Sequence, residues 1–113
     1  MLRYLIEKLE ALGYPVYYQG SIASDKAYPE SFITYLTVTS TDEAHFDNAP
    51  MVCAWRYQIT FYSSSPALVE SVPMQIRAAL KTAGFIPDGR GRDIPSDVDT
   101  HTGWTTDYYY IET

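Results

Sequence analysis

Apolar residues near the start of the chain recur every three or four positions. This spacing places their side chains on one side of a helix, while Glu7, Lys8 and Glu10 fall on the other side. Gly13 follows the last apolar position and is a typical helix-terminating residue. The pattern predicts an amphipathic helix of about three turns, with an apolar face formed by Leu2, Leu5, Ile6, Leu9 and Leu12.

Two strands are predicted in the next part of the chain. Residues 16–18 follow Pro15, which excludes continuation of the helix, and residues 32–40 are β-branched or aromatic almost throughout. The polar residues between these segments predict a loop. The connection over residues 41–50 is too long for a tight hairpin, so we expect an exposed loop or an extended β-arm there.

Residues 51–62 form a long predicted strand whose two faces differ. One face is almost entirely apolar and is expected to belong to the core: Met51, Cys53, Trp55, Tyr57, Ile59 and Phe61. The other face is mixed, polar enough for water and aromatic enough for a partner: Val52, Ala54, Arg56, Gln58, Thr60 and Tyr62. We expect this strand to be the antiparallel neighbour of residues 32–40.

A second helix is predicted directly after the long strand. The serines at 63–65 precede Pro66, and this order suits a helix start because serine oxygens cap free amides and proline fits the first turn. Gly84 is expected to end the helix, and Pro73 predicts a kink or a restart within it. The apolar face of this helix consists of Leu68, Val69, Val72, Ile76, Ala79, Leu80 and Ala83.

The rest of the chain completes the predicted fold. Residues 85–103 contain a turn at Asp88 and Gly89 and two prolines, so we expect an irregular region with a strand at most over its first residues. The aromatic and threonine content of residues 104–113 predicts a terminal strand. The element order predicts one α+β domain over residues 1–113, with an antiparallel sheet of about four strands and two helices packed on one face.

Composition narrows the class of function. The 113 residues carry a formal charge of −6, which argues against tight wrapping of nucleic acid because phosphate binding needs clustered lysine and arginine. Eleven tyrosines fit either a sheet-rich fold or a contact surface, and the lone Cys53 is interpreted as a buried residue of a reducing compartment. The N-terminal residues resemble neither a signal peptide nor a membrane span, so we expect a cytoplasmic chain without membrane contact.

Several polar residues invite a chemical interpretation. Arg90 and Arg92 in "DGRGRD" could meet a phosphate, but a flexible turn with solvated arginines is the simpler interpretation. Two acidic clusters contain possible metal ligands, yet neither has the spacing of a known metal-binding loop. Both are interpreted as solvated surface: Asp93, Asp97, Asp99 and His101, and Asp42, Glu43, His45 and Asp47.

Nucleophilic catalysis would need a serine or cysteine beside a base. Neither His45 nor His101 lies in a recognisable setting, and the serines at 63–65 are already explained as a helix cap. No pair of carboxylates stands out for acid–base chemistry. We therefore expect no enzyme, and we assign no catalytic residue, cofactor or metal.

The order of the elements resembles that of a known family. The resemblance lies in the leading amphipathic helix, the strand "FITYLTVTS", the step from "WRYQITFYS" into "SSSPALVESVPMQIRAALKTAGF", and the aromatic closing strand. Together these segments resemble the small tail-terminator or head–tail joining proteins of long-tailed bacteriophages and prophages, over nearly the whole chain. Pro73 and the loop over residues 88–103 depart from the resemblance.

The resemblance implies a virion assembly protein made in the cytoplasm of a bacterial host. Copies of such proteins form a ring, commonly sixfold, at the head-proximal end of the tail tube, stop its growth and join it to the head connector or stopper protein. The net negative charge would let DNA slide through the ring without binding. The residues expected to contact neighbouring subunits or the tube are Arg56, Gln58, Tyr62, Asp42, Glu43, Phe46 and Asp47.

Three other functions stay open at this point. Other neck proteins, with a stopper or head-completion role, share the small size and the acidity of this chain. A small metal-dependent hydrolase could use His101 with Asp97 or Asp99. A ligand-binding or adaptor domain could use the tyrosine-rich sheet.

Overall fold

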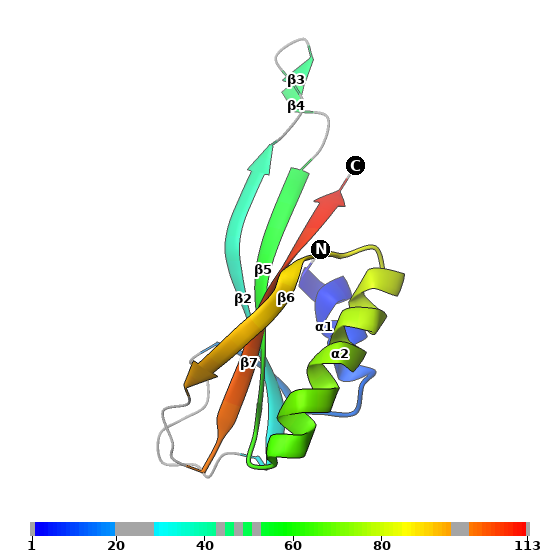
Figure 1. Cartoon of the computed structure of the whole chain (residues 1–113). Coiled ribbons are helices and arrows are strands. Elements are labelled where there is room, and N and C mark those ends of the chain that lie inside the picture. The colour runs from blue at the N-terminus through cyan, green and yellow to red at the C-terminus, as the bar shows by residue number, and fades with distance from the viewer. Residues whose placement is uncertain are drawn as a thin grey trace.

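The computed structural model describes residues 2–19, 29–42, 45–46, 49–50, 53–95 and 100–112, and for residues 39–42, 45–46, 49–50 and 112 it describes the backbone alone. The elements in these ranges are shown in Figure 1. In chain order they are α1 (Leu2–Glu10), β1 (Val16–Tyr18), β2 (Ser31–Asp42), β3 (His45–Phe46), β4 (Ala49–Pro50), β5 (Cys53–Ser63), α2 (Pro66–Thr82), β6 (Ile86–Pro95) and β7 (Thr102–Glu112).

The fold is α+β, with one mixed sheet of five strands in the order β1-β2-β5-β7-β6. The β2–β5, β5–β7 and β7–β6 pairs are antiparallel, and β2 and β5 pair as the sequence predicts. Strand β1 instead runs parallel to β2, with Val16 opposite Ile33, so the prediction of about four antiparallel strands is wrong in its detail. The twelve residues between Tyr18 and Ser31 are long enough to return the chain to the same end of the sheet, which a hairpin turn cannot do.

Strand β6 occupies residues for which the sequence predicts an irregular region. Its prolines, Pro87 and Pro95, are tolerated because β6 is an edge strand and needs hydrogen bonds on one side only. The register between β6 and β7 shifts between Asp88 and Arg92, and Gly89 and Gly91 have φ values of 77° and 95° there. Two glycines in the left-handed region make this a β-bulge within a strand, so the prediction of an irregular region beyond the first residues is wrong for residues 89–95.

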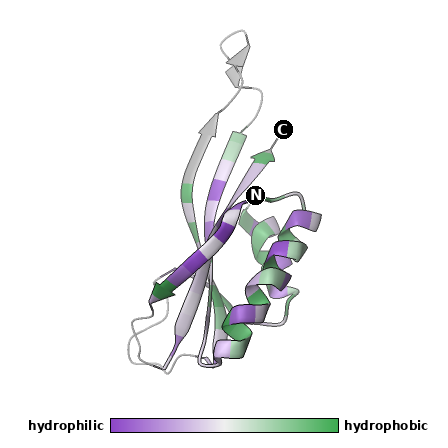
Figure 2. Ribbon diagram, viewed as in Figure 1, coloured by the Kyte–Doolittle hydropathy of each residue, from purple (hydrophilic) through white to green (hydrophobic). Residues whose placement is uncertain are grey.

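Both helices pack on the same face of the sheet (Figure 1). The core between them and the sheet contains the alternate residues Tyr57, Ile59 and Phe61 of β5, as the sequence predicts. Figure 2 shows hydrophobic and hydrophilic residues on both helices, and hydrophilic residues along most of β6. The helices contribute Leu5, Leu9, Val69, Val72, Ile76 and Leu80 to this core, and Ile33, Phe85 and Tyr108 complete it.

Helix α2 differs from the prediction in its cap and in its continuity through Pro73. It begins at Pro66 as expected, but Ser65 makes no side-chain capping bond. The amide of Ser65 instead donates to the hydroxyl of Ser63 (3.0 Å), which in turn lies 2.9 Å from the hydroxyl of Ser31. The helix continues as one element through Pro73, so the predicted restart is wrong.

The segment that joins β2 to β5 contains the small ladder of β3 and β4. Phe46 lies opposite Ala49 in this ladder, beyond the last β2–β5 pair, Asp42 opposite Cys53. This arrangement agrees with the expected β-arm. The molecule is elongated, with principal extents of 53 × 28 × 23 Å, and Figure 1 places β3 and β4 at one end of its long direction.

Candidate functional site

The face of the sheet that α1 and α2 leave uncovered carries the mixed residues of β5. Directly opposite residues of antiparallel strands share a face, and Arg56 lies opposite Tyr109 of β7 while Gln58 lies opposite Asp107. On β6, Asp88 also lies opposite Asp107. Three strands that are separate in the sequence therefore bring their polar residues to one place on this helix-free face.

Arg56 is the centre of a hydrogen-bonded ion-pair cluster on the helix-free face. Its Nε and Nη2 atoms both donate to Oδ2 of Asp107, at 2.9 Å and 2.7 Å. Nη2 also donates to Oδ2 of Asp88 at 3.1 Å, and Nη1 donates to the hydroxyl of Tyr109. These bonds, together with the pairing of the strands, hold the guanidinium group in one orientation before any partner binds.

The electrostatics of this cluster keep the arginine charged. The hydrogen bond to Asp107 raises the pKa of Arg56 above its ordinary value, and the negative charges of Asp107 and Asp88 raise it further. Desolvation of the guanidinium group acts in the opposite direction but does not outweigh them. The guanidinium carbon also lies 4.8 Å from the centre of the Tyr109 ring, a cation–π distance. One cation and two carboxylates leave the cluster with a formal excess of one negative charge.

Two exposed isoleucines flank the ion-pair cluster. Ile86 lies opposite Tyr109 and has 54% of its surface exposed, and Ile111 lies opposite Ala54 with 46% exposed. Large apolar side chains beside a rigid arginine and a tyrosine are typical of protein–protein interfaces. We call this surface the Arg56 patch and define it as Arg56, Ile86, Asp88, Asp107, Tyr109 and Ile111.

The predicted contact residue Tyr62 is largely buried against neighbouring residues of the sheet. Only 9% of its surface is exposed, and its ring stacks on Phe32 with a centroid distance of 5.2 Å. It also covers Gly103 of the adjacent strand, where an added Cβ would lie 2.8 Å from the ring. Tyr62 therefore offers little surface to a partner, whereas Arg56 and Gln58 remain partly exposed on the same face.

The remaining predicted contact residues lie in or near the β3–β4 arm. The backbone of Asp42 ends β2 opposite Cys53, and the backbone of Phe46 lies opposite Ala49. Glu43 and Asp47 lie outside the described residues. The structure therefore brings Arg56 and Gln58 together on the sheet, and the acidic side chains of the arm lie outside what it describes.

Sequence reasoning predicted β7 as the terminal strand but missed strand β6 and the contribution of both strands to the Arg56 patch. The alternation of Asp107, Tyr109 and Ile111 in the terminal strand was a usable signal, because alternate residues of a strand share a face. No comparable signal existed for Ile86 and Asp88, which fall in a segment interpreted as irregular. Their position depends on the pairing of β6 with β7, and a sequence pattern does not specify that pairing.

The segment "DGRGRD" is an anchored bulge within strand β6, so the prediction of a turn is wrong, whereas the prediction of solvent-exposed arginines is confirmed. The indole N–H of Trp104 donates to the carbonyl of Arg90 at 2.9 Å, and the side chain of Arg77 donates to the carbonyl of Gly89. These bonds tie the bulge to β7 and to α2. Arg90 and Arg92 are exposed on this strand.

His101, the centre of the metal-hydrolase alternative, ties two segments together. Its Nε2 atom lies 2.8 Å from the carbonyl oxygen of Pro29, and its Nδ1 atom lies 2.9 Å from the hydroxyl of Thr100. A carbonyl oxygen can only accept, so Nε2 carries the hydrogen. His101 is 8% exposed and lies beside Phe32. The suggested companions Asp97 and Asp99 lie outside the described residues.

The part of the chain that the structure describes shows neither a cluster of metal ligands nor a membrane-spanning helix. No group of three or more His, Cys, Asp or Glu side chains that could hold a metal ion is found among those residues. None of the described helices is long and apolar enough to span a membrane. Cys53, the single cysteine of the chain, is half-buried at the start of β5.

Comparison with known proteins identifies no family for this chain. No model of a known protein family matches the chain, and a search of the curated proteins finds no match either.

Proposed function

We propose that this chain is a structural subunit of a long-tailed bacteriophage or prophage that forms a ring with copies of itself at the head-proximal end of the tail tube. The ring ends polymerisation of the tube and joins the tail to the head connector. This proposal combines the resemblance in the order of elements with the surface of the folded chain. The observation that carries it is the Arg56 patch, a pre-organised surface on a face that the helices leave uncovered.

The composition of the Arg56 patch supports a protein partner. Its arginine is held by two carboxylates and a tyrosine, so little side-chain freedom is lost when a partner binds. The exposed isoleucines Ile86 and Ile111 supply apolar area next to this polar centre. Interfaces commonly combine an apolar core with arginine and aromatic anchors in this way.

The two sides of the molecule differ, which suits a ring of identical subunits. A head-to-tail ring needs two different complementary surfaces on each copy, because the contact is not self-complementary. The helix-free face carries the Arg56 patch, whereas the opposite side presents the outer surface of the helices, including the exposed Met74 of α2. The long sheet and the β3–β4 ladder at its end extend far enough from the core for each copy to contact a neighbouring copy.

Electron microscopy tests the proposal directly. Concentrated protein is examined alone and after mixing with tail tubes assembled without their terminating protein. We expect rings in the first sample, or protein capping one end of each tube in the second, with tube growth stopped. Monomers that leave tube ends bare and growth unaffected contradict the proposal.

A stopper or head-completion protein is the sibling assignment within the same assembly. It uses the same kind of surface but contacts the head connector rather than the tube. The same experiment separates the two assignments when purified connectors are added in place of tubes. Binding to tubes supports the terminator, and binding to connectors alone supports the sibling.

A further inference from the structure

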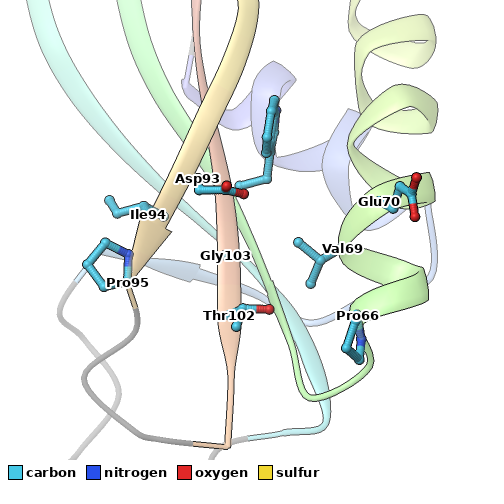
Figure 3. A pocket seen from close by; sticks show the side chains of 9 residues that line it. Pro66, Val69, Glu70, Asp93, Ile94, Pro95, Thr102 and Gly103 are labelled. Carbon is cyan, nitrogen blue, oxygen red and sulfur yellow. The ribbon is translucent and has the colours of Figure 1, made fainter.

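A groove separate from the Arg56 patch lies between the start of α2 and the edge strand β6, with β7 as its floor. Figure 3 shows its lining residues, and its volume is about 510 Å³. The lining is formed by Pro66, Val69, Glu70, Asp93, Ile94, Pro95, Thr102, Gly103 and Trp104. Most of these side chains are apolar, and the groove is open to solvent.

Two carboxylates are the charged groups of this groove. Glu70 comes from α2 and Asp93 from β6, and Figure 3 shows them on opposite walls with Val69 between. Both side chains are exposed, and neither forms an ion pair with any other residue that the structure describes. No arginine or lysine is among the residues that line the groove. An occupant that satisfies both walls therefore carries positive charge.

The floor of the groove suits a cationic side chain with an apolar stem. Trp104 is held in place by the hydrogen bond from its indole N–H to the carbonyl of Arg90 (2.9 Å), so its ring is fixed in orientation. Aromatic rings attract guanidinium and ammonium groups, and the stems of arginine and lysine pack on apolar surface. Ile94, Pro95 and Val69 provide that apolar surface next to Trp104.

The edge strand beside the groove favours an extended polypeptide over a small amine. Strand β6 pairs with β7 on one side and is the last strand of the sheet, so its other backbone edge has no strand partner among the described residues. An extended segment can use such an edge for main-chain hydrogen bonds while alternate side chains enter the adjacent pocket.

We propose that this groove binds an extended, basic segment of a partner protein, with one arginine or lysine side chain held between Glu70 and Asp93 above Trp104. The charge of the groove selects against acidic segments, which would meet two carboxylates. It also selects against a second copy of this chain as partner, because the chain carries a net charge of −6. The site does not depend on the proposed ring, since it uses none of the residues of the Arg56 patch.

A model peptide tests this proposal with the intact protein. The probe is an acetylated and amidated pentapeptide, valine-threonine-arginine-valine-threonine, and its matched control carries citrulline, which is neutral and nearly isosteric with arginine. Binding is followed by nuclear magnetic resonance of the ¹⁵N-labelled protein at low salt. We expect the arginine peptide to shift the indole N–H resonance of Trp104 and the amides of β6, and to bind about tenfold more tightly than the citrulline peptide.

Charge-neutralising variants locate the binding. The double variant Glu70→Gln with Asp93→Asn is expected to reduce affinity for the arginine peptide about tenfold and to leave affinity for the citrulline peptide unchanged. The control is Glu7→Gln with Glu10→Gln, which removes two exposed carboxylates from α1 and is expected to change neither affinity.

Four outcomes of the peptide experiments overturn the proposal. They are no shift at millimolar arginine peptide, equal binding of the arginine and citrulline peptides, full affinity in the Glu70 and Asp93 variant, and shifts that map to the Arg56 patch. Groove resonances that depend on protein concentration without peptide would identify a second copy as the occupant and also overturn it. Ring formation or tube binding is measured separately, so failure of this site and failure of the proposed function are distinguishable.

Discussion

Tyr108 shows how the position of one residue in the core changes its chemistry. It lies on β7 opposite Tyr57, and 1% of its surface is exposed. Burial raises its pKa to about 12, while the positive charge of Arg77 and a hydrogen bond with Thr106 act in the lowering direction. The neutral phenol is therefore favoured in the folded state more than in the unfolded chain, where the ordinary value is about 10.

A pH dependence follows from this raised pKa. Between about pH 10 and pH 12 the unfolded chain loses the Tyr108 proton while the folded chain keeps it, so stability falls as the pH rises. The contribution of one such group is about 1.4 kcal/mol per pH unit in this window. Urea unfolding of Tyr108→Phe is expected to show a shallower loss of stability than the original protein over the same range.

A second tyrosine provides the control for this measurement. Tyr18 is 50% exposed at the edge of the sheet, so Tyr18→Phe is expected to keep the slope of the original protein. A Tyr108→Phe slope as steep as that of Tyr18→Phe would show that burial of Tyr108 does not set this dependence.

At the scale of single elements, strand β6 depends on its glycine bulge. Both Gly89 and Gly91 have positive φ values, but only Gly91 is enclosed. A Cβ atom at Gly91 would collide with the side chains of Thr106 and Trp104 and with the backbone oxygen of Thr105, whereas one at Gly89 meets nothing within 4 Å. Substitutions at these two glycines therefore separate the cost of the left-handed backbone conformation from the cost of steric clashes with neighbouring atoms.

This contrast predicts different costs for the same substitution. Gly89→Ala is expected to lower the free energy of unfolding by about 1–2 kcal/mol, the cost of placing an L-residue in the left-handed region. Gly91→Ala has that cost and must also displace its neighbours, so we expect a further loss of about 1–3 kcal/mol. Chemical denaturation measures both values, and equal losses for the two variants would contradict the enclosed bulge.

At the scale of the whole molecule, the Arg56 patch and the outer surface of α2 are the two proposed contact surfaces of a head-to-tail ring. The double variant Ile86→Lys with Ile111→Lys removes the exposed apolar area of the patch, and Met74→Lys removes a comparable residue on α2. All three positions are about half exposed, so the effect on folding is expected to lie within about 0.5 kcal/mol per substitution.

The patch predicts the result of this comparison. Burying an isoleucine side chain contributes about 1.5–3 kcal/mol, so the Ile86 and Ile111 variant is expected to weaken self-association or tube binding by at least about tenfold. Met74→Lys is expected to weaken ring formation as well, because a head-to-tail ring needs a second surface and the outer side of α2 is the proposed one. Sedimentation velocity over a concentration series measures the self-association of both variants. Unchanged association of the Ile86 and Ile111 variant excludes the patch as the contact.

Much of the fold follows from local patterns in the chain. The period-two alternation of Tyr57, Ile59 and Phe61 correctly predicts which face of β5 enters the core, because successive side chains of a strand point to opposite sides. The three-to-four spacing of Leu5 and Leu9 correctly predicts the buried face of α1. These features depend only on neighbours within one element, so the sequence by itself determined them.

The remaining features depend on contacts between segments far apart in the chain. The parallel direction of β1 and the edge position that allows Pro87 and Pro95 in β6 both depend on which strands pair. The Arg56 patch requires β5, β6 and β7 to align in one register. Arg56 donates hydrogen bonds to Asp88 and Asp107, which lie 32 and 51 positions further along the chain. Only the tertiary structure decided these points, since long-range pairing reflects the packing of the whole sheet and has no local signature.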